Sequence, residues 1–580
     1  MKHNMWRANF WYGFVIVVFA LCLARLFYIQ ILQHGHYSSA ALSDQYKEYQ
    51  IPAARGVIRA QDGDRVVPIV LSQTLYTIYA DPEMIKDVAK TAETTANEIG
   101  GDAKTYAELM SGEGRYVVLA KKVSAEARDK LLKHEMPGIG SQSQSYRTYP
   151  QGTLAANLLG FVDDEGVGRY GIEQALQNEL AGTAGQLKAV TDINGVPLAA
   201  SEDNVRVPAV AGDDVVLTID IGMQKQAEQL LKQGLDRAQS ERGSVVIMEA
   251  KTGAVKAMAN YPSYDPANYG NVDDAAVFTN AAAAVPLEIG SIMKPLTAAA
   301  ALNLGAVKAD STFYDARRIQ IDDRVVTNVE EDGGAGVKSV AQILNLSLNT
   351  GATWLLMQMG GGELNQKART TWYDYMTEHY RFGTETGIEQ GYEAAGYVPS
   401  PTKGDGLNIT YANTSFGQAM TATPLQVAAA YSAMLNGGTY YQPHLVAGTI
   451  DATGKTEATA PKVLKSDVVS GQVSKEIQSM MEYVVANHRF ERRFDTAYSV
   501  GGKTGTAELV DPATGVYYTN EFNGTYAGFV GGDDAEYIIV VVTEKPQIAG
   551  YAGSRAAQPL FADIAHMLLD NYNVPTKSGR

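Results

Sequence analysis

The 580-residue chain has almost no cysteine, few histidines and no excess of positive charge. Its one cysteine, Cys22, lies in an apolar N-terminal run, so the rest of the chain cannot form a disulfide, a zinc–thiolate site or a thiol nucleophile. The eight histidines show no metal-ligand spacing, and we expect no metal and no organic cofactor. The net charge of −16 argues against nucleic acid as a partner, because a phosphate-binding surface leaves a basic signature.

A long apolar run occupies residues 10–32 and is interrupted by Arg25. As a helix it would measure roughly 35 Å, which is enough to cross a bilayer. Basic residues precede the run, so we predict a cytoplasmic tail at residues 1–9, a single-pass helix at residues 10–32 and an extracytoplasmic remainder at the inner or plasma membrane. Arg25 is costly in lipid and invites a polar partner. A signal peptide cleaved at Ser39-Ala40-Ala41 is the alternative interpretation.

The remainder divides at a polar stretch near Ser201–Gly212. Residues 33–212 combine strand signals, a helical region rich in Ala, Lys and Glu, and a turn-dense segment. Residues 213–575 have strand patterns at both ends and helical patterns between them, which is typical of an antiparallel sheet with helices on its faces. We therefore predict an α+β chain with two domains after the anchor, residues 33–212 and 213–575.

Several segments of the second domain carry clear patterns. The predicted strands are Val215–Ile219, Ser244–Met248, Ala254–Ala259, Tyr526–Val530 and Tyr537–Thr543, and the predicted helices are Asp220–Ala238 and Pro559–Tyr572. All five strands are expected in one antiparallel sheet.

Three short motifs stand in order in this domain: Ser291-Ile292-Met293-Lys294, Ser347-Leu348-Asn349 and Lys503-Thr504-Gly505-Thr506. Each alone is common by chance, and each has a plain structural interpretation, with the serines and the asparagine as helix caps or turn residues and the lysines as solvated side chains. Together they supply a nucleophile, a base one helical turn away, polar groups that relay protons and a cationic strand that holds a carboxylate. The combination predicts an acyl transferase that attacks an amide with Ser291.

Ser291 opens a helix-like segment that runs to Leu304, so the Lys294 amine is expected on the same face as the Ser291 hydroxyl. A lysine with a pKa of about 10.4 is a poor base at neutral pH. Burial and a second cation would lower that pKa, and we expect Lys503 to be the second cation. Pro295 is expected to fit poorly in the first turn, which argues against a purely helix-building role for this segment.

The third motif has the pattern of a strand. Alternate side chains share a face, so Thr504 and Thr506 are expected to line up while Lys503 points elsewhere. Gly505 removes a side chain where another backbone lies close, and a substrate strand could add to this edge. The backbone N–H groups of Thr506 and Ser291 are candidates for an oxyanion hole.

With these motifs in place, the chain resembles a class B penicillin-binding protein, a monofunctional peptidoglycan D,D-transpeptidase. The resemblance covers nearly the whole length and includes Arg55-Gly56-Val57-Ile58, Tyr149-Pro150, Gly171-Ile172-Glu173, Tyr261–Pro266, Ser415-Phe416-Gly417-Gln418, Thr423–Gln426 and Asn436-Gly437-Gly438. The chain departs from the family pattern at Ile289, where members usually have proline, and at Ala60-Gln61, where they have Asp-Arg.

The resemblance implies a mechanism. Ser291 would attack the D-Ala-D-Ala carbonyl of a peptidoglycan stem peptide with Lys294 as base, and terminal D-Ala would leave after protonation through Ser347. The acyl group would pass to an amine on a neighbouring stem peptide. The Lys503–Thr506 strand would bind the terminal carboxylate of the donor, and Asn349 is expected to hold the substrate amide. Beta-lactams would acylate Ser291 because they mimic the donor.

The resemblance also implies an architecture and partners. Residues 33–212 would form an elongated pedestal, and residues 213–575 the penicillin-binding transpeptidase domain. A SEDS-family glycosyltransferase and other division proteins are the expected partners, and the length and compact pedestal favour the septal type over the elongation type. A serine β-lactamase is disfavoured because Gly361 stands where the deacylating glutamate would be needed. A membrane-anchored β-lactam sensor or scaffold is the remaining alternative.

Overall fold

The structure, a computed structural model, describes residues 2–37, 46–190, 205–329, 333–404, 406–510 and 517–578. The candidate cleavage site Ser39-Ala40-Ala41 and the start of the predicted domain boundary, residues 201–204, lie outside the described residues. The chain divides into two compact units, one formed by residues 1–54 with 182–212 and the other by residues 55–181 with 213–580.

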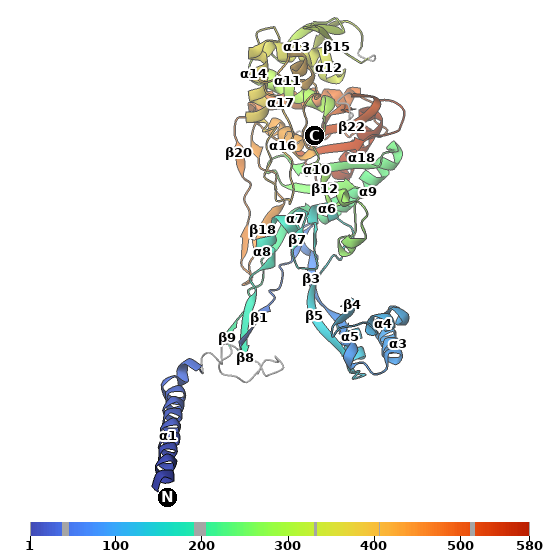
Figure 1. Cartoon of the computed structure of the whole chain (residues 1–580). Helices are drawn as coiled ribbons and strands as arrows, with labels where there is room; N and C mark the ends of the chain where they lie inside the picture. Colours follow the sequence, from blue (N-terminus) through green and yellow to red (C-terminus); the bar gives the residue numbers. More distant parts are fainter. Residues whose placement is uncertain are drawn as a thin grey trace. The chain divides into compact units, whose positions relative to one another are not determined.

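The smaller unit contains the N-terminal helix α1 (Lys2–Phe27), which continues into the π-helical turn η1 (Tyr28–Leu32) (Figure 1). The segment Asn9–Leu32 is long and apolar enough to cross a membrane, with a mean hydropathy of 2.4. The Arg25 guanidinium lies 5.4 Å from the centre of the Tyr28 ring, a distance typical of a cation–π contact. The same unit holds an antiparallel sheet of order β1 (Tyr46–Ile51), β8 (Gly185–Val190) and β9 (Val205–Val207).

The larger unit contains a sheet of order β19-β18-β10-β2-β3-β4, with β5 paired to β3. Its strands are β2 (Ile58–Asp62), β3 (Arg65–Ala80), β4 (Val117–Val123), β5 (Ile139–Thr148), β10 (Asp214–Asp220), β18 (Val446–Ile450) and β19 (Thr456–Ala458). Strand β10 pairs in parallel with β2 and antiparallel with β18. The predicted strand Val215–Ile219 is therefore real, but its place in the antiparallel sheet of the other four strands was wrong. Its partner β2 precedes the predicted boundary at residues 212/213, and that boundary stays a prediction.

Three helices pack against the second half of β3. They are α3 (Val88–Ile99), α4 (Ala103–Met110) and α5 (Ala125–Leu132), and each begins after a side-chain cap, from Asp87, Asp102 and Ser124 respectively. Their apolar faces bury Ala92, Met110 and Leu131 in one cluster with Ile78 and Ala80 of β3. This lobe is held together by its own small core.

A buried ion cluster joins two of the segments that carry the family resemblance. The short elements here are α6 (Ala156–Leu159), β6 (Phe161–Val162), β7 (Gly168–Arg169), α7 (Gly171–Ala175) and α8 (Gln177–Ala181). Glu173 of α7 is fully buried and accepts hydrogen bonds at 2.8 Å from Nε of Arg55 and at 2.8 Å from Nε of Arg147. A Cβ on Gly168 would come within 1.8 Å of the Glu173 carbonyl oxygen, so only glycine fits beside this cluster.

A five-stranded antiparallel sheet forms the centre of the second part of the chain (Figure 1). Its order is β12 (Val255–Tyr261), β11 (Arg242–Glu249), β23 (Ala535–Glu544), β22 (Tyr517–Gly531) and β21 (Ser499–Val510). The other four predicted strands overlap β11, β12, β22 and β23, which confirms them. Strand β21, which carries the third motif, stands at one end of this order.

Helices cover both faces of the sheet, because successive side chains of a strand point to opposite sides. Val245 and Ile247 of β11 pack in one cluster with α9 (Ile221–Ala238) and α18 (Gln558–Asn571). Val246 and Met248 pack in another cluster with α11 (Lys294–Asn303) and α16 (Pro424–Leu435). The α+β prediction is confirmed, and both predicted helices end within one residue of α9 and α18.

The remaining elements connect these layers. The helices are η2 (Pro82–Met84), η3 (Pro266–Asn271), η4 (Ala275–Phe278), α10 (Ala281–Ala284), η5 (Gly290–Met293), α12 (Val340–Asn345), α13 (Asn349–Met359), α14 (Gln366–Asp374), η6 (Tyr375–His379), α15 (Asn408–Thr414), α17 (Gly471–Asn487) and η7 (Gly553–Ala557). The strands are β13 (Thr312–Asp315), β14 (Arg318–Ile321), β15 (Arg324–Thr327), β16 (Gly336–Ser339), β17 (Tyr440–Tyr441) and β20 (Val463–Lys465).

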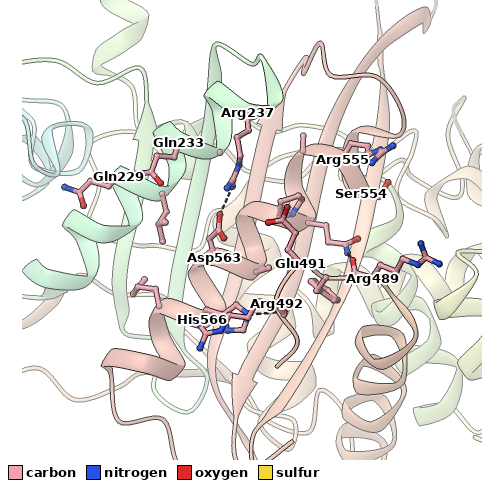
Figure 2. A pocket seen from close by; sticks show the side chains of 18 of the residues that line it. Gln229, Gln233, Arg237, Arg489, Glu491, Arg492, Ser554, Arg555, Asp563 and His566 are labelled. Carbon is pink, nitrogen blue, oxygen red and sulfur yellow. Dashed lines mark hydrogen bonds and ion pairs between the residues drawn. The ribbon is translucent and has the colours of Figure 1, made fainter. Parts of the chain in front are cut away.

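A groove of about 680 Å³ lies against α9 and α18, and Figure 2 shows its side chains. Two of its arginines are ion-paired, Arg237 with Asp563 at 2.6 Å and Arg492 with Asp570 at 2.7 Å. These ion pairs neutralise the charges of two arginines in the groove. The described residues that line it include none of the predicted site residues.

Candidate active site

Ser291 lies in η5, a 3₁₀ turn that leads directly into α11 at Lys294. Side chains three residues apart eclipse in a 3₁₀ helix, so Ser291 and Lys294 share one side. The expectation that Pro295 fits poorly was wrong, because Pro295 is the second residue of α11, and the first turn of a helix tolerates proline.

Backbone contacts hold the turn that carries Ser291. Gly290 has a φ of +64°, and its N–H donates to the carbonyl oxygen of Gly417 at 2.9 Å. A Cβ on Gly290 would come within 2.6 Å of the Thr506 carbonyl oxygen, and a Cβ on Gly417 within 1.8 Å of the Gly290 carbonyl oxygen. The Ser415–Gln418 segment and strand β21 therefore press on the nucleophile turn from two sides, and side chains at these glycines would push them apart.

Lys294 is fully buried, and its amine faces the second motif. Its Nζ lies 2.6 Å from the Ser347 carbonyl oxygen, 2.8 Å from Asn349 Oδ1 and 3.0 Å from Ser347 Oγ. The first two oxygens can only accept, whereas the hydroxyl can also donate. A neutral amine fits this set, because its two N–H groups serve the two obligate acceptors and its lone pair remains for a hydroxyl proton.

The second motif lies at the junction of α12 and α13. Ser347 has a left-handed backbone with a φ of 54°, a conformation that costs a non-glycine residue about 1–3 kcal/mol. The residue that precedes α13, Leu348, makes no side-chain capping bond to any described residue. Asn349 Nδ2 donates to the Thr327 carbonyl oxygen at 3.1 Å, which orients Oδ1 toward Lys294. The polar atoms of this motif therefore serve the Lys294 amine and do not cap the helix.

Lys503 is also fully buried, on the side of β21 away from the two threonines. Its Nζ donates to the Thr504 carbonyl oxygen at 2.9 Å and lies 3.2 Å from Thr504 Oγ1. Burial lowers the pKa of Lys503 to about 7. Burial, and next the charge of Lys503, hold the pKa of Lys294 well below its usual value. The expected effect of Lys503 on the Lys294 pKa is thus present, but burial is the larger cause.

A cleft of about 630 Å³ opens over these groups. Five of the predicted site residues line it: Ser291, Ser347, Asn349, Thr504 and Thr506. The two lysines and Gly505 lie buried next to it. A Cβ on Gly505 would come within 2.2 Å of Thr525 Oγ1 and 2.7 Å of the Ile289 carbonyl oxygen. The backbone for which Gly505 makes room is therefore that of Ile289 in the same chain, rather than that of a substrate.

The cleft is also lined by residues for which the sequence predicted no role. They include Val329, Phe416, Gln418, Glu508, Phe522 and Tyr551. Phe416 and Gln418 belong to a segment that the resemblance singled out, so a signal existed for them. Tyr551 comes from the loop after β23, and only the tertiary fold brings it to the cleft.

Two family models match the chain. The penicillin binding protein transpeptidase domain matches residues 243–566, and the penicillin-binding protein dimerisation domain matches residues 50–217. The chain belongs to the penicillin-binding protein transpeptidase family.

Named relatives agree with this assignment to class B penicillin-binding proteins. The penicillin-binding protein PbpB of Mycolicibacterium smegmatis is 31% identical over 504 residues, which cover 85% of this chain and 75% of that protein. The peptidoglycan D,D-transpeptidase FtsI of Escherichia coli is 26% identical over 577 residues, which cover 98% of this chain and 92% of that protein. The crystal structure of penicillin-binding protein 3 of Mycobacterium tuberculosis with aztreonam aligns with a TM-score of 0.68 and 26% identity. The alignment covers 91% of this chain and 98% of that chain. This class B penicillin-binding protein is a serine-type D,D-transpeptidase.

Proposed function

We propose that this transpeptidase cross-links peptidoglycan stem peptides through an acyl-enzyme on Ser291, in the synthesis of the division septum. One observation carries the proposal. A fully buried lysine with a strongly lowered pKa, Lys294, shares a side of one turn with a serine that opens into a cleft. A neutral amine in that place is a competent general base for the serine hydroxyl.

These contacts support the following acylation step. Ser291 Oγ attacks the carbonyl carbon between the two D-Ala residues, and its proton passes to Lys294 Nζ. The C–N bond then breaks, and the leaving D-Ala nitrogen takes a proton through the Ser347 hydroxyl, which lies 3.0 Å from Lys294 Nζ. Asn349 accepts from the lysine amine through Oδ1, and the Nδ2 hydrogen that is not bonded to Thr327 would donate to a substrate amide in the cleft.

The two threonines of β21 are suited to bind the donor carboxylate. Thr506 Oγ1 accepts the Gly553 N–H at 3.0 Å, and Thr504 Oγ1 lies 3.2 Å from Lys503 Nζ. Each hydroxyl oxygen is thus engaged as an acceptor, so each hydroxyl hydrogen is available to donate to an anion in the cleft. The nearby Lys503 charge favours the same anion. The backbone of Thr506 lies against Gly290, which supports the N–H groups of Thr506 and Ser291 as the oxyanion hole.

Labelling with a fluorescent penicillin tests the nucleophile. We expect the wild-type chain to bind the label covalently and stoichiometrically, and we expect Ser291→Ala to lose all labelling because the variant lacks the hydroxyl that would form the ester. Ser143→Ala, which removes an exposed serine of β5, is the matched control and should label normally. Labelling of Ser291→Ala, or sustained turnover of a chromogenic cephalosporin by the wild type, would contradict the proposal.

The orientation, the septal role and the partners belong to the same proposal. The N-terminus would lie in the cytoplasm and the cleft outside it, and the apolar helix with Arg25 would contact a polytopic SEDS-family glycosyltransferase and other division proteins.

A fluorescent fusion should gather at midcell, whereas accumulation along the lateral wall would support the elongation type. Arg25→Leu should weaken co-purification of the glycosyltransferase, and unchanged co-purification would speak against Arg25 as the contact.

A further inference from the structure

One charged side chain stands out in the catalytic cleft. Of the described residues that line the cleft, Glu508 alone carries a formal charge. It follows Thr506 by two residues on β21, so it lies on the same face of the strand and roughly 7 Å further along it. Phe522 of β22, which is the register partner of Glu508, lines the cleft beside it.

The described residues give the Glu508 carboxylate no structural partner. Within the described part of the chain, no side chain forms an ion pair or a hydrogen bond with it. The neighbouring carboxylate Glu521 is different, because it pairs with Lys545 at 2.7 Å. A second acid, Glu288, lies close enough to interact electrostatically with Glu508, and it accepts from Tyr517 Oη at 2.8 Å and from the Ala419 N–H at 2.9 Å. Burial raises the pKa of Glu288, so its charge is disfavoured.

The Glu508 carboxylate therefore makes its end of the cleft negative, whereas the end at Thr504 and Thr506 attracts anions. A half-enclosed carboxylate with no partner among the described residues is partly desolvated, and a cation that docks beside it gains a charge-assisted hydrogen bond. A donor strand with its terminal carboxylate at the two threonines would extend along β21 toward Glu508. Glu508 would repel a second carboxylate there and would attract a protonated amine.

We propose that Glu508 binds the protonated side-chain amine of a stem peptide and so sets the preference of the enzyme for a basic residue in its substrate. The inference rests on the proposed function, in which both the donor and the acceptor are stem peptides and each carries such an amine. The amine at Glu508 is that of the donor strand on β21 or that of the incoming acceptor.

The two sources differ in chemistry. A donor amine stays protonated throughout and serves only to hold the strand. An acceptor ammonium first releases one proton to water, and its nitrogen then attacks the acyl carbon. A new C–N bond forms, the bond from that carbon to Ser291 Oγ breaks, and the second amine proton returns to Ser291 Oγ through Lys294. Glu508 would raise the local concentration of the acceptor before this step.

Two pairs of substrates distinguish the sources. In the first arm, peptides with lysine or norleucine before the D-Ala-D-Ala end are compared as donors, by release of D-Ala without acceptor. In the second arm, a fixed donor is combined with Nα-acetyl-lysine amide, which is cationic at neutral pH, or with hydroxylamine, which is neutral. The variant Glu508→Gln is compared with Glu521→Gln, which neutralises a carboxylate of the same hairpin that already has a partner.

In one of the two arms, we expect the ratio of kcat/KM for the cationic substrate to kcat/KM for the neutral one to be roughly tenfold higher in the wild type and in Glu521→Gln than in Glu508→Gln. A factor of that order corresponds to one hydrogen bond to a charged group. Glu508→Gln should remove that preference through KM, and added salt should reduce it in the wild type. An equal loss for cationic and neutral substrates, or an unchanged preference in both arms, would overturn the inference. Penicillin labelling distinguishes a failure of the proposed function from a failure of the inference about Glu508. A wild type that is not labelled refutes the proposed function. A Glu508→Gln variant that is labelled and keeps its substrate preference refutes only the role of Glu508.

Discussion

Two buried lysines lie beside the floor of the catalytic cleft, and the charge of Lys503 contributes to the lowered pKa of Lys294. A charged amine without solvent is costly, and two nearby amines raise that cost further, so the pair holds fewer protons than two exposed lysines would. Burial, and next the charge of Lys503, hold the pKa of Lys294 well below its usual value, and burial lowers the pKa of Lys503 to about 7. The lowered pKa of Lys294 favours a neutral base next to Ser291, and Lys503 is partly charged at neutral pH near the carboxylate site.

The lowered pKa values of the two lysines predict a pH dependence of acylation. Lys503 is protonated below its pKa of about 7 and neutral above it, so its attraction for an anionic substrate is lost as the pH rises through 7. We expect the second-order rate of acylation by an anionic penicillin to fall on the alkaline side of about pH 7, and to fall on the acidic side when Lys294 becomes protonated. Stopped-flow acylation measured from well below pH 7 to well above it records the alkaline limb, and the acidic limb where Lys294 becomes protonated.

Lys503→Arg is the control for the alkaline limb, since arginine stays charged over this range. The alkaline fall should be absent in that variant, although its rate is expected to be lower at every pH because the guanidinium is larger. An alkaline fall that persists in Lys503→Arg would assign the limb to another group.

At the scale of elements, packing of backbone on backbone positions the nucleophile. Gly417 has a φ of +90°, and a methyl group there would collide with the Gly290 carbonyl oxygen. Gly417→Ala should displace the turn of Ser291 by a fraction of an ångström or more, and a displacement of 1 Å costs roughly a hundredfold in rate. We expect the acylation rate with penicillin to fall by about that factor.

Gly454→Ala is the matched control for this prediction. Gly454 has a similar φ of +85°, but no described atom lies within 4 Å of a Cβ at that position. It therefore carries the same backbone strain without the collision, and its acylation rate should stay near the wild-type value. Equal rates for the two variants would show that strain alone, and not the contact with Gly290, determines the effect.

The ion cluster around Glu173 supports a different prediction. Glu173→Ala would leave two buried guanidinium groups without their shared carboxylate, a change that typically costs about 3–5 kcal/mol. Urea unfolding should show this loss in the free energy of unfolding. Glu126→Ala, which removes an exposed carboxylate paired with Lys130 on α5, should change stability little. A similar loss in both variants would contradict the special role of the buried cluster.

The sequence predicted much of this arrangement, and the failures have physical reasons. The spacing of Ser291 and Lys294 and the alternation of Thr504 and Thr506 are local, so the pattern of residues contains them. The partner of β10 is not local, since an apolar strand pattern does not say which distant strand completes its hydrogen bonds. Likewise, Tyr551 reaches the cleft only through the packing of a loop.

At the scale of the whole molecule, β10 links the segments on either side of the predicted boundary. Beyond its ladder with β2, Asp214 accepts from the Val57 N–H at 2.7 Å and pairs with Arg59 at 2.8 Å. A fragment of residues 213–580 would lose these partners and expose an apolar strand edge. We expect it to melt at least several degrees below a chain of residues 46–580 and to aggregate in gel filtration. Equal melting temperatures would show that the second part is independently stable.

The same ladder has a consequence for hybrids between related enzymes. An exchange of the catalytic half at residue 212 would bring a foreign β10 against the native β2, and the parallel alignment of Val215 with Ile58 would have to be recreated by strands that did not evolve together. A functional hybrid therefore requires β2 and β10 to be transplanted as a pair, with the crossover points placed outside both strands.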